Sequence, residues 1–251
     1  DEPPAPTGTT PSFCTDSRML INCVVYENGH KRAHIAVADI SDWLCRPQCF
    51  VWVALQDPDA HELAQMQEEF GLHELAVEDA LKGHQRPKIE EYGDTVFVVM
   101  HLLDPADAAR TEELAGELAV FAGPRFVLSV RSRSPKGFLD VRERCEREPE
   151  LLQHGAGFVL YALMDAVVDR YFPVVDGFES ELDRVEEQIF TPGAARGNIE
   201  QLYALKSRTG LLRPAAPPLV DVPGKLHRRH PHPAQADRDA VVHANEALAD
   251  P

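Results

Sequence analysis

Residues 72–100 read LHELAVEDALKGHQRPKIEEYGDTVFVVM, and they are the most specific stretch of this chain. An acidic pair, Glu78 and Asp79, stands near the end of a short helical pattern. A polar turn and an Arg-Pro-Lys step at 86–88 follow, and an apolar strand at 96–100 closes the stretch. Because polar turn residues separate a helical pattern from a strand pattern, the stretch predicts a short helix, a turn and then a strand.

Two further stretches accompany this one. Residues 161–190 read YALMDAVVDRYFPVVDGFESELDRVEEQIF, and residues 201–222 read QLYALKSRTGLLRPAAPPLVDV. In this order, the three stretches resemble the cytoplasmic N-terminal domain of the CorA family of divalent-metal transporters. The soluble part of that family carries the pattern EDxLxxxQRPKxExY before an apolar strand, and residues 78–92 match it. The resemblance covers most of residues 43–245.

The composition limits the class of partner. The chain has 251 residues, 44% of them hydrophobic, which is normal for a globular protein with a core. Its formal net charge of −16 argues against nucleic acid as a partner, since nucleic-acid binding needs stripes of Lys and Arg. This charge suits divalent cations, but plain solubility is the better explanation of a net charge taken alone.

The cysteines predict a reducing compartment. Their number is five, which is odd, and they lack the spacing of a disulfide framework. Cys45 and Cys49, with His30 and His34 upstream, are a conceivable zinc site. The C-x3-C spacing is not a standard zinc spacing and no second Cys pair follows, so we do not expect a structural zinc there.

No membrane span is predicted. No apolar run approaches the roughly 18–20 residues that cross a bilayer, and no signal peptide is recognisable. Members of the CorA family end in two membrane helices with a Gly-Met-Asn loop. The resemblance therefore implies that this chain is the part that precedes those helices, on the cytoplasmic side of the cell membrane.

Local patterns predict the elements of the first half. An Asn-Gly turn at 28–29 inside residues 19–37 is a strong hairpin signal. Helical spacing over 60–70 ends at Gly71. The remaining expectations are strands at 50–58, 95–103, 117–122 and 125–130, and helices at 72–82 and 135–147.

The second half is predicted to be helical. Residues 156–190 have helical spacing, with Pro173 as a candidate kink, and we expect them to form a helical hairpin arm. A further helix, the expected start of a stalk, begins near Ile199. Six prolines lie between 214 and 233, so we expect this helix to be broken or bent between Arg213 and Pro233.

These patterns give a domain plan. Residues 1–16 are polar and rich in proline, and we expect them to be disordered. Residues 17–150 are predicted as an α/β domain, and residues 151–251 as a helical arm with a partial stalk. The resemblance implies the fold class: an α/β/α sandwich with a mixed sheet, followed by long helices.

Several carboxylates and one histidine are candidate metal ligands. Oxygen and imidazole ligands suit hard or borderline divalent cations. Asp165 and Asp169 are one helical turn apart, and so are Asp239 and His243, which places each pair on one helix face. Taken singly, these residues fit an exposed helix face equally well, and the Glu78-Asp79 pair fits a local turn. Only their joint placement in the family pattern favours the interpretation that these residues are metal ligands.

The resemblance implies two metal sites between subunits. In CorA relatives, the Asp of the ED pair shares one regulatory metal with a stalk Asp of the next subunit. Carried over, this site is Asp79 with Asp239. A second site combines Glu78, Asp165, Asp239 and His243.

The resemblance implies a function as the regulatory metal-sensing domain of a Mg²⁺/Co²⁺ transporter. Such a domain works in a homo-oligomer, a pentamer, in which metal between subunits controls the pore. A zinc transporter of the same superfamily stays open as an alternative, and so does a stand-alone metal-binding module. We do not expect an enzyme, because no G-x-S-x-G, P-loop, G-x-G-x-x-G or H-E-x-x-H pattern is present.

Overall fold

One mixed sheet organises the protein, whose computed structural model describes residues 20–103, 116–189 and 195–212. Its strands are β1 (Leu20–Glu27), β2 (His30–His34), β3 (Cys49–Gln56), β4 (Lys88–Tyr92), β5 (Thr95–Leu102), β6 (Gly116–Ala122) and β7 (Phe126–Ser132). Within the described residues their order is β2-β1-β3-β7-β6-β5-β4. The β3–β7 pair is parallel and the other neighbours are antiparallel, which makes the sheet mixed.

The first two strands form the hairpin that the sequence predicts. Asn28 and Gly29 have φ values of 51° and 78°, the left-handed conformation that a tight hairpin turn requires. A side chain at Gly29 would also overlap the carbonyl oxygen of Pro149. Glycine is therefore needed there both for the backbone conformation and for the close approach of a neighbouring helix.

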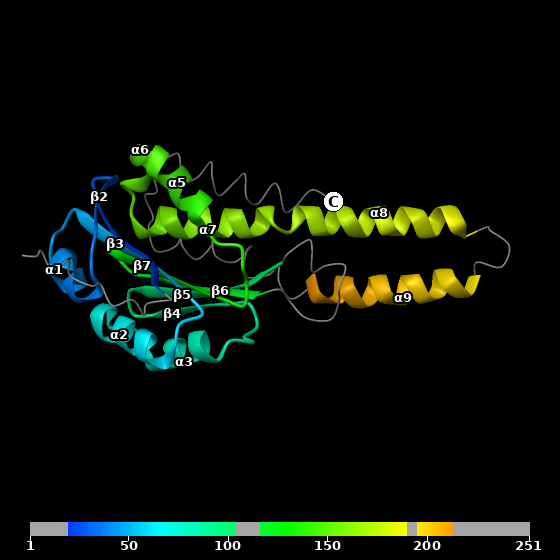
Figure 1. Ribbon diagram of the computed structural model, residues 1–251, viewed down its shortest axis with the longest axis horizontal. Helices are drawn as coiled ribbons and strands as arrows, with labels where there is room; N and C mark the ends of the chain where they lie inside the picture. Colours follow the sequence, from blue (N-terminus) through cyan, green and yellow to red (C-terminus); the bar gives the residue numbers. More distant parts are fainter. Residues whose placement is uncertain (1–19, 104–115, 190–194, 213–251) are drawn as a thin grey trace, which may run out of the picture.

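Helices cover both faces of the sheet (Figure 1). The helical elements are η1 (Val37–Asp39), α1 (Ile40–Leu44), α2 (Ala60–Phe70), α3 (Glu74–Lys82), α5 (Leu139–Arg147), α6 (Pro149–Leu152), α7 (Ala156–Asp169), α8 (Phe172–Gln188) and α9 (Ala195–Leu212). One apolar core joins α1, α2 and α3 to the sheet, and a second joins α5, α6 and α7 to the opposite face. The fold is therefore the predicted α/β/α sandwich with a mixed sheet.

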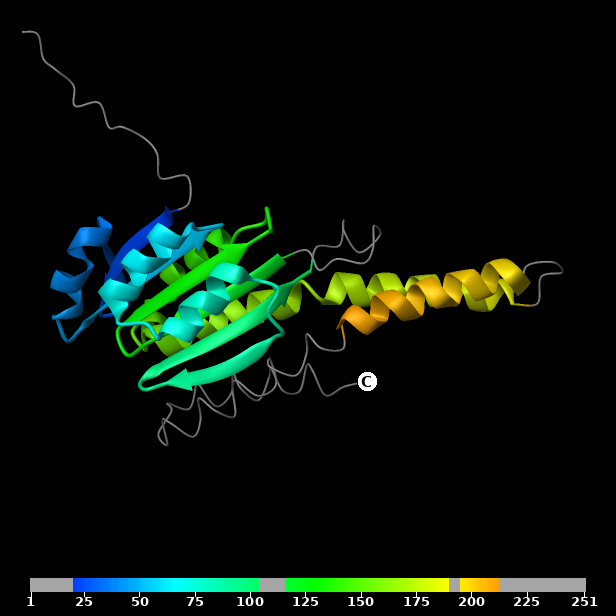
Figure 2. The ribbon, with the colours of Figure 1, turned by 90° about the horizontal axis from the view of Figure 1, so that it is seen from below.

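Local signals in the sequence place α2. Asp59 accepts a hydrogen bond from the backbone N–H of Glu62, and the Glu62 side chain accepts one from the backbone of Asp59. This reciprocal capping box begins the helix. Gly71, with φ 63°, ends it as predicted. Figure 2 shows α2 and α3 lying across one face of the sheet.

The helical arm differs from its prediction. Residues 156–188 form α7 and α8, which follow one another along nearly one line (Figures 1 and 2). Pro173 stands in the first turn of α8, where its missing N–H breaks no hydrogen bond. A helical hairpin within 156–190 was expected and is wrong: the hairpin forms between α8 and α9. Val174 and Phe178 of α8 share a small apolar cluster with Leu205 of α9.

Other expectations missed elements or fall outside the described residues. The strand β4 was not predicted, because its sequence, KIEEY, is mostly charged and only half-buried. The expected disorder of 1–16 and the expected break between Arg213 and Pro233 lie outside the described residues. The domain boundary at 150/151 stays a prediction. No helix of the described ranges is long and apolar enough to span a membrane.

Candidate metal-binding carboxylates

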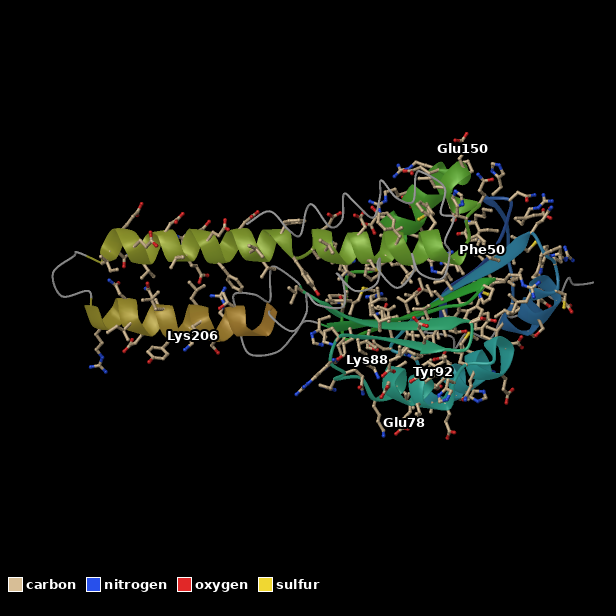
Figure 3. The ribbon with its side chains drawn as sticks, turned by 180° about the vertical axis from the view of Figure 1, so that it is seen from behind. Phe50, Glu78, Lys88, Tyr92, Glu150 and Lys206 are labelled. Carbon is tan, nitrogen blue, oxygen red and sulfur yellow. The ribbon has the colours of Figure 1, made fainter. Side chains whose placement is uncertain are left out.

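The helix α3 carries the acidic pair at the surface. The side chain of His73 accepts a hydrogen bond from the backbone N–H of Leu75 and caps the start of the helix. Ala76, Val77 and Ala80 are buried against the sheet. Glu78 and Asp79 therefore lie away from the core, and Glu78 points outward in Figure 3. The exposed fractions of their side chains are 47% and 25%, so both carboxylates are partly accessible from solvent.

The segment after α3 is tied to the sheet. The Nε2 atom of buried His101 lies 2.8 Å from the backbone carbonyl oxygen of Gln85. The Arg133 guanidinium lies 2.6 Å from Nε2 of His84 and 3.0 Å from a carboxylate oxygen of Glu117. These contacts fix the course of the chain from α3 into β4. The acidic pair is therefore placed relative to the side chains of β4.

Asp79 is bound by a lysine of its own chain. The Lys88 ammonium lies 2.6 Å from Oδ2 of Asp79 and 2.9 Å from Oε2 of Glu90. The Tyr92 hydroxyl donates a 2.8 Å hydrogen bond to the same oxygen of Glu90. Figure 3 shows Lys88 and Tyr92 nearer the sheet than Glu78. One ammonium thus bridges two carboxylates beside α3.

Lys88 stays protonated in this environment. Burial lowers the pKa of Lys88, but its hydrogen bonds to Asp79 and Glu90 outweigh that effect and raise the pKa above its ordinary value. The ammonium also lies 5.7 Å from the ring centroid of Phe97, within the range of a cation–π contact. Lys88 therefore acts as a permanent positive charge between the two carboxylates.

Glu78 is paired with a more exposed lysine than Asp79 is. Its carboxylate pairs with the Lys82 ammonium one helical turn later, and the Lys82 side chain is 65% exposed. The hydrogen bond to Glu78 raises the pKa of Lys82. Exposed pairs at this spacing contribute little to stability, so Glu78 is readily released to another cation.

Asp165 lies on the other face of the sheet. It belongs to α7, and its carboxylate accepts a 2.8 Å hydrogen bond from Arg144 of α5. Burial, and then the charge of Asp165, raise the pKa of Asp169 one turn later. A cleft of about 340 Å³ adjoins this pair, and its lining includes Lys136 and Arg147 as well as Arg144. A cation that binds Asp165 would therefore meet a largely basic neighbourhood.

The predicted ligands do not converge within one chain. Glu78 and Asp79 are neighbours on α3, whereas Asp165 lies across the sheet from them. Asp239 and His243 lie outside the described residues. In the ranges that the structure describes, no three His, Cys, Asp or Glu side chains are grouped to hold a metal ion. A site made of these residues would need ligands from more than one chain.

The side chains of β4 were not predicted to take part in a site. Lys88, Glu90 and Tyr92 occupy alternate positions of one strand, so they share a face. Their partners on β5 include Phe97 and Val99, which belong to the core under α2 and α3. The sequence carries one signal for this grouping, the Lys-x-Glu-x-Tyr pattern. If residues 88–92 had been recognised as a strand, this alternation would have placed the three side chains on one face.

Comparisons with known proteins agree with this architecture. YfjQ of Bacillus subtilis, which is named as a metal ion transporter, is 36% identical over 136 residues, or 54% of this chain and 41% of that protein. The cobalt/magnesium transport protein CorA of Thermotoga maritima is 30% identical over 165 residues, or 65% of this chain and 46% of that protein. This chain thus spans less than half the length of either relative.

A solved structure and a family profile extend the agreement. The structure of the full-length CmaX protein superimposes with a TM-score of 0.70 at 26% identity, covering 92% of this chain and 70% of that one. The profile of the CorA-like Mg²⁺ transporter proteins matches residues 47–250, which is most of the chain. The three sequence stretches, the mixed sandwich and this match lead to one conclusion: the chain belongs to the family of CorA-like Mg²⁺ transporter proteins.

Proposed function

We propose that this chain is the regulatory, metal-sensing part of a divalent-cation transport protein on the cytoplasmic side of a membrane. The observation that carries the proposal is the surface position of Glu78 and Asp79 on α3. Carboxylate oxygens are the ligands that Mg²⁺ prefers in proteins. Because both side chains stay partly exposed, a second chain can approach them and complete a coordination shell.

The proposed sites lie between neighbouring chains of a homo-oligomer, a pentamer in the whole protein. One metal is shared by Asp79 of one chain and Asp239 of the next. A second is held by Glu78, Asp165, Asp239 and His243. The cargo and regulatory ion is Mg²⁺ or Co²⁺. Zn²⁺ is the alternative, since imidazole and carboxylate ligands accept it as well.

Electrostatics supplies the gating step. Each chain carries a formal net charge of −16, so neighbouring chains repel one another unless cations bridge their carboxylates. With metal bound, the closed arrangement is stabilised. When the ion concentration falls, the metal leaves, the carboxylates repel, and the population shifts toward separated chains and an open transport path.

The test is metal-dependent stability. Mg²⁺ that binds only the folded chain should stabilise it by mass action, by about 2.7 kcal/mol at a hundredfold excess over Kd, and so raise the thermal midpoint. Asp79→Asn should remove most of that rise. Asp176→Asn makes the same charge change at an exposed position of α8 and should keep the rise. Equal gains in wild type and Asp79→Asn would refute the assignment of Asp79.

The same titration distinguishes the ions. Co²⁺ and Zn²⁺ should be compared with Mg²⁺ at equal ionic strength. A rise that Asp79→Asn abolishes for Mg²⁺ and Co²⁺ supports the proposal. A rise seen with Zn²⁺ alone would favour the zinc alternative.

A further inference from the structure

Lys88 already fills the place of a cation beside Asp79. Its ammonium contacts Oδ2 of Asp79 at 2.6 Å and Oε2 of Glu90 at 2.9 Å. The side chains of Lys88 and Asp79 are each 25% exposed, so this pair is more sheltered than the Lys82–Glu78 pair, whose side chains are 65% and 47% exposed. Sheltered charge pairs are screened less by salt and bind more firmly.

A metal ion at Asp79 cannot leave this arrangement unchanged. Both the ion and the ammonium are positive, and both would bind the same carboxylate, whose Oδ2 the ammonium already contacts. Their mutual repulsion at such short range opposes simultaneous binding. The ammonium has a second position available, because Glu90 can hold it alone. The Tyr92 hydroxyl keeps the Glu90 carboxylate in place by its 2.8 Å hydrogen bond.

We propose that Lys88 is a built-in competitor for the metal at Asp79: it bridges Asp79 and Glu90 in the metal-free chain and withdraws to Glu90 when a divalent cation binds. The lysine thereby sets the ion concentration at which the sensing site fills. This inference rests on the proposed metal site at Asp79 and adds a residue that regulates it. A transporter that must respond to abundant ions needs a weak sensor, and an internal competitor weakens a carboxylate site without removing a ligand.

The decisive measurement is the Kd of the chain for Mg²⁺ by isothermal titration calorimetry at low ionic strength. Lys88→Met removes the ammonium and should tighten binding by about three- to tenfold, the range expected when one charged competitor is lost. Lys88→Arg keeps the charge and should not tighten binding. The gain should shrink as NaCl is added, because salt screens the competition.

A charge-matched control separates this effect from net charge. Lys206 is an exposed residue of α9, on the arm and far from β4 in Figure 3. Lys206→Met removes the same charge and should change the Kd by less than about twofold, since distant surface charges are screened. If Lys88→Met and Lys206→Met bind Mg²⁺ equally, the competitor role is refuted.

A second pair of variants tests the same point without altering Lys88. Glu90→Gln deprives the ammonium of its alternative position, so Lys88 should hold Asp79 more firmly and weaken Mg²⁺ binding by about threefold. Glu91→Gln removes a charge at the next position, on the opposite face of β4, and should weaken binding less. Equal weakening by the two variants would overturn the proposal, even if Lys88→Met fails to fold.

The double variant separates the two hypotheses. In an Asp79→Asn background, Lys88→Met should no longer tighten binding, because the carboxylate in dispute is gone. If Asp79→Asn alone binds Mg²⁺ as wild type does, the proposed metal site fails. If Asp79→Asn abolishes binding but Lys88→Met has no effect in the wild-type background, only the competitor role fails.

Discussion

The hydroxyl of Tyr171, at the junction of α7 and α8, donates a 2.7 Å hydrogen bond to the backbone carbonyl of His101 near the end of β5. Burial raises the pKa of Tyr171 well above its usual value, so the hydroxyl remains a donor across the physiological range. The contact joins the base of the helical arm to the sheet. The same residue, His101, contacts the backbone carbonyl oxygen of Gln85 with its side chain and so holds the segment after α3.

Tyr171→Phe should therefore destabilise the protein. The variant keeps the ring but leaves the His101 carbonyl without this donor, and we expect the free energy of unfolding to fall by about 1–2 kcal/mol. Tyr203, on α9, is 69% exposed, so Tyr203→Phe is the matched control and should have little effect. Urea unfolding measures both. Equal stability of the two variants would show that the junction contact is unimportant.

A second prediction concerns the buried Arg142, which is 4% exposed. Its guanidinium lies 3.9 Å from the ring centroid of Trp52 and donates a 2.9 Å hydrogen bond to the Tyr26 hydroxyl. Tyr26 in turn donates to Glu146 at 2.7 Å. Arg142→Met should lower the free energy of unfolding by about 2–4 kcal/mol, because it removes one member of a buried polar network.

The control for this variant lies on the same helix. Arg147 is exposed, and Arg147→Met should change the free energy of unfolding by less than about 0.5 kcal/mol. Chemical denaturation at neutral pH compares the two. A stable Arg142→Met protein would mean that the network contributes specificity of packing and no net stability.

Alkaline pH should destabilise the fold through two buried thiols. Burial raises the pKa of Cys23 and of Cys145 from 9.0 to about 11. A raised pKa means that the folded state favours the neutral thiol, so stability is complete below about pH 9 and is lost as pH rises toward 11. The loss is on the order of 2–3 kcal/mol per thiol.

The measurement is the slope of unfolding free energy against pH between 9 and 11. Cys145→Ala should be less stable at neutral pH but should show a shallower slope, since one of the buried thiols that titrate in this range is gone. Cys45 is exposed, and Cys45→Ser should retain the wild-type slope. Identical slopes in all three proteins would contradict the assignment.

Assembly should depend on divalent metal if the proposed sites lie between chains. Sedimentation velocity should show mostly monomer without metal and a shift toward oligomer as Mg²⁺ rises, because cations must bridge chains that each carry −16. NaCl at matched ionic strength should not reproduce the shift. Asp79→Asn should remain monomeric. A sedimentation distribution that does not change with Mg²⁺ would show that these carboxylates do not join chains in this protein.

Short-range patterns in the sequence were enough to predict most of the local elements, and the resemblance to the CorA family implied the class of the fold. Asn28 and Gly29 specify a turn that requires the left-handed backbone conformation, and Asp59 and Gly71 mark the two ends of α2. These signals act over a few residues, so they can be read without the rest of the chain. The acidic pair Glu78-Asp79 was likewise recognisable because it stands inside a distinctive pattern.

Tertiary structure alone decided how distant side chains meet. β4 becomes a strand only because β5 supplies its hydrogen-bond partners, and this pairing brings Lys88 and Glu90 beside Asp79. Asp165 lies across the sheet from that cluster because α7 packs in the opposite core. Such contacts depend on long-range pairing and on burial, which no local pattern encodes. The sequence therefore identified candidate ligands, and the folded chain showed that a lysine already holds one of them.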